Sequence, residues 1–309
     1  MLPTLLGILF FTFLIIQFVP GGPVEQLVNK LSGLDSISES SSSSNTYRGS
    51  NGLSDEHIEQ LNKFYGFDKP FLERFFIMIG NYASFDLGMS YFHNQSVGDL
   101  ILSKLPVSIS LGLWSFIIVY LVSIPLGIKK AVNDGSRFDI ISSTIVLIGY
   151  SIPGFVLGIG LIVLLGGGSF FDIFPTRGLV SDDWSNLSVI EKILDYLWHI
   201  TLPIICLIIG SFAVMTMLTK NSFIDEINKL YTVTARAKGL SENKVLYSHV
   251  FKNAIIPILT GFPAQFVSAF FTGSILIETI FSLDGIGLLS YEAIIQRDYP
   301  VVMGTLFVF

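Results

Sequence analysis

The residues that most often carry chemistry are few in this chain and lie far apart. His57, His93, His199 and His249 fall in four separate regions, so no pair has the spacing of metal ligands. Cys206 is the only cysteine and lies within an apolar run, so no disulfide within the chain is possible. No GxxxxGK[ST] phosphate-binding loop occurs, so we expect ATP to bind a different chain. The sequence predicts no catalytic residue, no metal ion and no cofactor.

One basic segment instead has a spacing suited to holding another protein. It reads Thr234-Ala235-Arg236-Ala237-Lys238-Gly239. Ala235 and Gly239 are four residues apart, so on a helix they share one face, where a neighbouring side chain could approach closely. Gly239 allows a sharp turn, and Ser241 can cap a second helix behind it. The alternative interpretation is a solvated basic loop without a partner.

The elements around this segment are those of a membrane protein. Of the 309 residues, 51% are hydrophobic and only 14% are charged, whereas soluble domains carry about a quarter charged residues. A membrane-crossing helix needs about 20 mostly apolar residues. Five stretches qualify, and an incomplete sixth starts near Pro300: Leu2–Val19, Leu105–Ile128, Ile140–Leu165, His199–Leu218 and Ile255–Phe281. We predict an all-α, polytopic membrane protein with five full helices.

Basic residues in the short loops predict the orientation. Nine lie in the loops after the second and fourth stretches, against three after the third and fifth. The basic loops, including 220–253, are therefore expected in the cytoplasm, together with the N-terminus. A secretory signal peptide is the alternative for the first stretch, but no Lys or Arg precedes Lys30.

The stretch 21–104 is then expected on the outer side, between the first helix (1–20) and a core domain (105–309). Its serine-rich insert, 36–52, has the composition of a disordered segment. Two helices are expected after it, one following Ser54 and one opening at Pro70, the second with an aromatic face containing Phe75 and Phe76.

Ionisable residues are scarce in the expected spans. The first four contain no Asp, Glu, Lys or Arg, which disfavours a secondary transporter or channel. Glu278, near the outer end of the fifth, is either a hydrogen-bonding anchor or a periplasmic gate or docking residue. Phe262, Phe266 and Phe270 share one face of that helix and either pack there or line a translocation path. A membrane enzyme is disfavoured by the missing catalytic residues.

The segment TARAKGLSENKVLYSHVFKNAIIPIL (234–259) resembles the cytoplasmic loop that docks the ATPase in permease subunits of oligopeptide and dipeptide ABC importers. Val233 and Thr234 stand where the family motif has glutamate and alanine. Further motifs of that family match in the same order along the chain: Pro20–Pro23, Tyr65–Pro70, Phe85–Gly88, Ser151–Pro153, His199–Pro203, Glu278–Ser282 and Arg297–Pro300. SNTYRG, SRFD, LWHITLP and TKNSF resemble its YejB-type branch, which is associated with import of peptides and of the peptide-nucleotide antibiotic microcin C.

The resemblance implies a type I ABC importer transmembrane domain in the bacterial inner membrane. It implies a homologous second permease, separate ABC ATPase subunits, a periplasmic or lipoprotein solute-binding protein and a peptide-like substrate, and no nucleic acid. Members of the family begin with a basic stretch and complete a sixth helix. This chain starts at the first helix and stops inside the sixth, so we expect a truncated gene product or a fragment.

Overall fold

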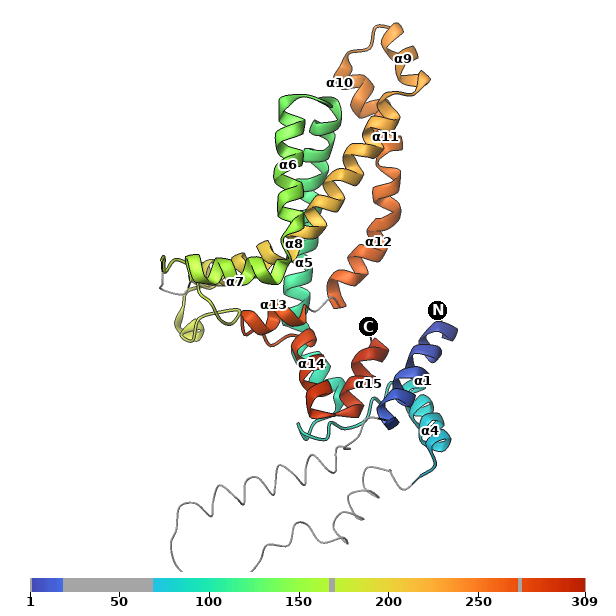
Figure 1. Cartoon of the computed structure of the whole chain (residues 1–309), viewed down its shortest axis with the longest axis vertical. Helices are drawn as coiled ribbons and strands as arrows, with labels where there is room; N and C mark the ends of the chain where they lie inside the picture. The colour runs from blue at the N-terminus through green and yellow to red at the C-terminus, as the bar shows by residue number, and fades with distance from the viewer. Residues whose placement is uncertain (1, 19–68, 167–169, 272–273, 309) are drawn as a thin grey trace, which may run out of the picture. The chain divides into compact units, whose positions relative to one another are not determined.

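The computed structural model describes residues 2–18, 69–166, 170–271 and 274–308. Within these ranges the secondary structure is helical apart from one antiparallel bridge between Met89 and Ser96. The elements in order are α1 (Leu2–Phe18), α4 (Phe71–Ala83), α5 (Val97–Val132), α6 (Arg137–Ser151), α7 (Gly154–Leu165), η2 (Trp184–Asn186), α8 (Val189–Ile227), α9 (Leu230–Ala237), α10 (Glu242–Val245), η3 (Leu246–Val250), α11 (Phe251–Ala254), α12 (Ile256–Phe271), α13 (Ile275–Ile280), α14 (Ile286–Gln296) and α15 (Tyr299–Val308) (Figure 1). The serine-rich insert and the helix expected after Ser54 lie outside the described residues.

The chain forms two compact units, Met1–Ser103 with Leu289–Phe309, and Lys104–Leu288. The sequence did not predict that the last helix would group with the first. In the first unit α1 packs against α15, and the aromatic face predicted after Pro70 is present on α4. The Phe75 ring lies 5.3 Å from that of Phe10 and 5.5 Å from that of Phe13, so the Phe75 side of α4 packs on α1, whereas Phe76 is exposed.

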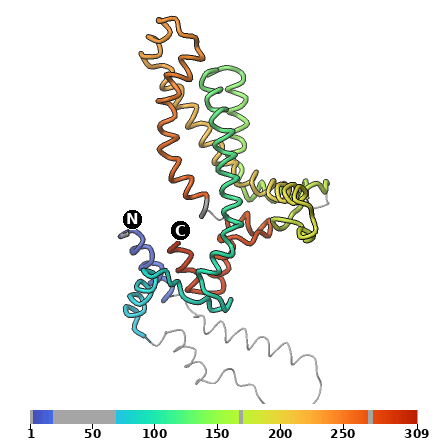
Figure 2. Tube along the Cα trace, turned by 180° about the vertical axis from the view of Figure 1, so that it is seen from behind, coloured from blue at the N-terminus to red at the C-terminus, as the bar shows by residue number. Residues whose placement is uncertain are grey.

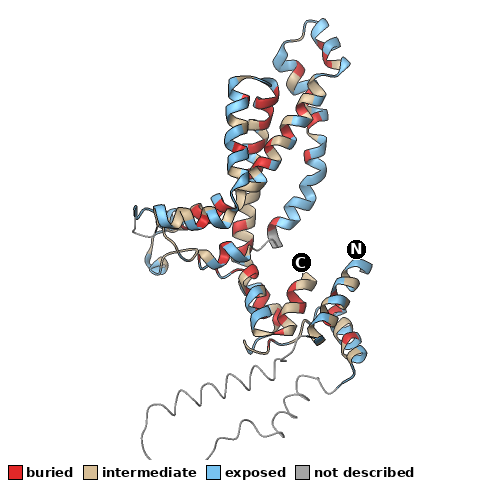
Figure 3. Cartoon of the chain, in the orientation of Figure 1, coloured by how far each residue is buried: buried red, intermediate tan, exposed pale blue. Residues whose placement is uncertain are grey.

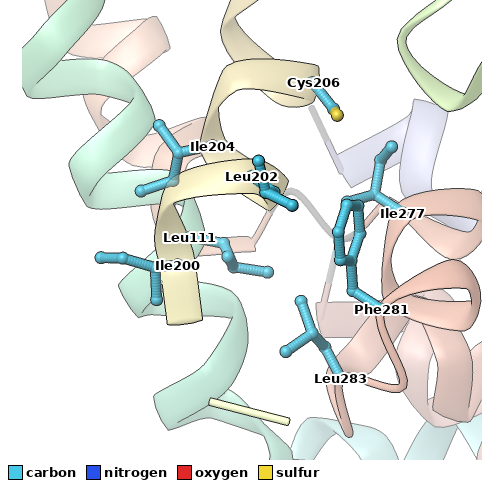
Figure 4. Packing of buried hydrophobic residues seen from close by; sticks show 8 residues of the cluster. All are labelled: Leu111, Ile200, Leu202, Ile204, Cys206, Ile277, Phe281 and Leu283. Atoms are coloured by element: carbon cyan, nitrogen blue, oxygen red, sulfur yellow. The ribbon is translucent and has the colours of Figure 1, made fainter. Parts of the chain in front are cut away.

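The second unit is built on two long helices. Within the described residues, α5 and α8 are the two single helices long and apolar enough to cross a membrane, and two bent helix pairs could add two further spans. α8 begins with a capping box in which Ser188 and Glu191 satisfy each other's backbone N–H groups. The core of the second unit joins α5, α8 and α13 with two residues that follow α13 (Figure 4). Its buried members are Leu111, Ile200, Leu202, Ile204, Cys206, Ile277, Phe281 and Leu283.

The third predicted span is not one straight helix. α6 and α7 meet at an angle of 94° (Figure 1), with the break at Ile152 and Pro153. Proline disfavours helical conformation in the residue before it, and Ile152 has extended backbone angles. After the break Gly154 approaches α8 so closely that a Cβ there would lie 2.5 Å from the Cys206 carbonyl oxygen. The SIP motif at 151–153 therefore turns the chain.

The fifth predicted span, Ile255–Phe281, is also divided. α12 ends at Phe271 and α13 begins at Ile275, and the two belong to separate helices of 16 and 6 residues. The Ser274 N–H donates to the side chain of Glu278 at 3.2 Å, so a side chain occupies the first turn of α13. The hydropathy of the stretch gave no sign of this interruption, because both pieces are apolar.

Candidate functional site

The candidate site is the segment that follows α8, and it forms a small helical platform. α9 is followed by the Gly239 turn, by α10, by the π-helical turn η3 and by α11. Gly239 has φ +78°, a value that favours glycine, so the predicted turn is confirmed. Ser241 occupies the predicted N-cap position of α10 but makes no capping side-chain hydrogen bond. Figures 1 and 2 show this platform at the same end of the second unit as the α5–α6 turn.

The predicted Ala235–Gly239 docking face is wrong in its geometry. α9 ends at Ala237, so Gly239 lies beyond the helix. The Ala235 methyl group is buried against the chain itself, in a cluster with six other buried side chains: Ile128, Ala131, Phe223, Val245, Val250 and Ala254. A helix on the surface of a chain packs one face on the core of that chain. α9 packs the face that carries Ala235.

The outward face of α9 is instead formed by Leu230, Val233 and Ala237. Positions i, i+3 and i+7 lie along one side of a helix. The Leu230 side chain is 84% exposed and that of Val233 is 53% exposed, although α9 lies outside the candidate membrane spans. Thr234 is exposed beside them. The platform therefore presents an apolar strip, which we call the α9 strip, on a helix that is not among the candidate membrane spans.

Polar side chains fix α9 to its neighbours. At its start Glu226 pairs with Lys229, and the Tyr231 hydroxyl donates to Glu226 at 2.6 Å. Burial raises the pKa of Tyr231, and the hydrogen bond to Glu226 raises it further, so the phenol remains a donor at neutral pH. At its end Arg236 reaches across the turn to Glu242 on α10 at 2.9 Å. Arg236 therefore links α9 to α10, while Lys238 is exposed.

Comparison with known proteins assigns the chain to a family. The family model described as "Binding-protein-dependent transport system inner membrane component" matches residues 123–309, more than half of the chain. The chain belongs to this family. It is 58% identical to the peptidoglycan transport system permease protein YejB of Agrobacterium fabrum, over all of this chain and 89% of that protein. It is 52% identical to the inner membrane ABC transporter permease protein YejB of Escherichia coli O157:H7, with the same coverage. The dipeptide transport system permease protein DppB of Escherichia coli K12 is 32% identical over 98% of this chain and 87% of its own length.

Glu278 of this permease is fully buried rather than at a surface. Its carboxyl group accepts hydrogen bonds from Ser274 N at 3.2 Å and from Leu288 N at 2.7 Å. Ser274 precedes α13 and Leu288 lies in the first turn of α14, so one carboxyl group caps two helices. A Cβ on Gly285 would lie 2.6 Å from the Glu278 carboxyl carbon, so glycine makes room for it. The anchoring alternative for Glu278 fits these bonds, while the gate or docking role stays a prediction.

The aromatic face predicted on α12 also faces α5. The rings of Phe262 and Phe266 are stacked 5.9 Å apart, and Phe116 and Tyr120 of α5 lie 5.2 Å and 5.5 Å from Phe262. The Phe270 side chain lies outside the described residues. Phe262 and Phe266 remain partly exposed, on a helix that is exposed along most of its length (Figure 3). Packing on α5 therefore accounts for one side of these rings and leaves the other accessible.

Sequence reasoning missed two buried carboxylates. Asp139 in the first turn of α6 pairs with Lys130 and Lys220, which the sequence argument counted only as loop charges. Asp298, between α14 and α15, accepts a hydrogen bond from Ser90 and one from Tyr91 N at 3.1 Å. The signal that could have found both is an acidic residue beside an apolar helix, where an ionised side chain requires a partner.

Proposed function

We propose that this chain is the membrane-spanning subunit of an ATP-driven, binding-protein-dependent importer of peptides or peptide-like solutes. The family membership and the names of the relatives, which include peptidoglycan and dipeptide transport systems, support this proposal. The observation that carries the mechanism is the α9 strip, an exposed apolar surface outside the candidate spans. ATP hydrolysis belongs to a separate ATPase subunit, since this chain contains no phosphate-binding loop.

In this proposal the segment 220–253 lies in the cytoplasm, and α9 within it docks the ATPase, with Leu230 and Val233 as the apolar centre of the contact. The N-terminus is cytoplasmic and residues 21–104 face the periplasm, where a solute-binding protein delivers the substrate. A second, homologous permease completes the translocation path. The accessible sides of Phe262 and Phe266 suit a place on this path, because α12 is exposed along most of its length.

The experiment is the substitution Leu230→Asp, followed by co-purification of the ATPase and uptake of a labelled peptide. Leu230 is the first residue of α9, where an acidic side chain interacts favourably with the helix dipole, so α9 itself should remain folded. Losing the burial of one leucine costs an interface about 1.5–3 kcal/mol. That cost lowers affinity roughly 10- to 150-fold. We expect the ATPase to be lost from the purified complex and uptake to fall accordingly.

Asn243→Asp is the matched control, because it places the same charge in the first turn of α10, on the same platform. It should retain the ATPase. Full ATPase association in Leu230→Asp, at normal membrane levels, would return the segment to a solvated basic loop. Retained association without peptide uptake in the unmutated complex would contradict the substrate class instead.

A further inference from the structure

One of the fully buried ionisable side chains among the described residues is a lysine. Lys130, in the last turns of α5, has no exposed surface. Its ammonium group lies 3.1 Å from Asp139 Oδ1 and also donates to Ser142 at 2.9 Å and Ser143 at 2.6 Å. A buried ammonium group without partners would be very unfavourable. Every one of these partners belongs to α6, so the charge holds α5 and α6 together.

The other oxygen of the same carboxylate binds α8. Lys220 Nζ lies 2.7 Å from Asp139 Oδ2 and 2.9 Å from Asp134 Oδ1 in the α5–α6 turn. Gly135 N donates to Asp139 Oδ2 as well, at 3.1 Å. Two lysines and two aspartates balance in charge. The cluster of Lys130, Asp139, Lys220 and Asp134, which we call the four-charge cluster, therefore joins three helices at one point.

The platform is attached to the same two long helices by apolar packing. Ile128 and Ala131, on either side of Lys130 in α5, lie in the cluster that contains Ala235 of α9 and Val245 of α10. Phe223, one turn beyond Lys220 on α8, is completely buried in it. The ends of α5 and α8 are thus held to α6 by charges and to the platform by apolar contacts.

We infer that the four-charge cluster is a positioning element that makes α6 move together with the platform, so that displacement of α9 by an ATPase reaches α6 and α7. This inference rests on the proposed docking role of α9. An interaction that must transmit a displacement has to resist separation in more than one direction. The two Asp139 oxygens, each bound by a lysine from a different helix, meet that condition. Apolar packing alone would allow the helices to slide past each other.

The test is Lys220→Met in the assembled transporter with its binding protein, in proteoliposomes. This substitution removes the α8 side of the cluster and leaves the Lys130–Asp139 pair intact. We expect membrane level and ATPase co-purification to stay at the level of the unmutated complex, while peptide transported per ATP hydrolysed falls at least about tenfold. Lys220→Arg, which retains the charge and its carboxylate bonds, should restore at least half of that ratio.

Arg137→Met is the matched control. Arg137 is exposed at the start of α6, two residues before Asp139, and also contributes one basic charge, so it tests the effect of charge on topology. A ratio in Lys220→Met equal to that in Arg137→Met would overturn the inference. Loss of ATPase binding in Lys220→Met would overturn it too, because the cluster would then shape the docking surface. If α9 does not dock the ATPase, Leu230→Asp will retain it. That result distinguishes failure of the proposed function from failure of this inference.

A second variant covers the case in which Lys220→Met does not accumulate. Replacing Lys130 and Lys220 by Met and Asp139 by Leu removes the buried charges together, which often preserves folding. We expect this triple variant to accumulate and bind the ATPase but to transport poorly per ATP hydrolysed. Transport at the level of the unmutated complex would show that ionic contacts are not needed for positioning.

Discussion

Glu278→Gln separates the two roles considered for this residue. Both oxygens of the carboxyl group accept hydrogen bonds from backbone N–H groups, those of Ser274 and Leu288. Glutamine has nearly the same shape, but one of its two terminal groups is a donor and would face a backbone donor. At least one buried hydrogen bond is therefore lost. Solvent cannot replace it, because the side chain is fully buried.

Loss of a hydrogen bond to a charged group lowers the free energy of unfolding by about 1.5–3 kcal/mol. For folded units of 150–250 residues, 1 kcal/mol corresponds to roughly 2–4 °C in melting temperature. We therefore expect Glu278→Gln to melt about 3–12 °C lower in detergent. The measurement is thermal unfolding followed by size-exclusion chromatography.

Glu292→Gln is the control for this experiment, because Glu292 is an exposed carboxylate on α14, the helix that Glu278 caps. It should leave the melting temperature unchanged. If Glu278→Gln melted like Glu292→Gln but abolished peptide uptake, the capping argument would be refuted. The residue would then act as a gate or a docking contact, as the sequence alone allowed.

Two glycines yield further expectations. Gly112→Ala should destabilise the protein strongly, because its Cβ would lie 1.7 Å from the Ala269 carbonyl oxygen of α12. Gly160→Ala is the control and should not destabilise it, because there is open space around that position. Equal melting temperatures for the two variants would contradict the close approach of α5 and α12. A Cβ on Gly239 would meet no atom within 4 Å. Gly239→Trp should therefore weaken ATPase co-purification more than Gly239→Ala, which shares only the backbone strain of about 1–2 kcal/mol. Equal ATPase recovery from the two Gly239 variants would place the turn outside the docking surface.

The sequence by itself determined the features that depend on neighbouring residues. Apolar runs of sufficient length predicted the membrane helices, and the 36 residues of α5 and 39 of α8 contain two of them. Gly239 predicted the turn after α9, because the conformation of a glycine is a local property. The motif order predicted the family that the comparisons show.

The tertiary structure decided which face of each helix is available and which charges meet. Spacing alone allowed either side of α9 to be the outer one; Phe223 and Val245 bury the side with Ala235, so Leu230 became exposed. Lys220 and Asp139 are 81 positions apart, and their contact follows only from the packing of α6 on α8. Helix rotation and long-range ion pairs are set by the sum of many distant contacts, which local periodicity does not encode.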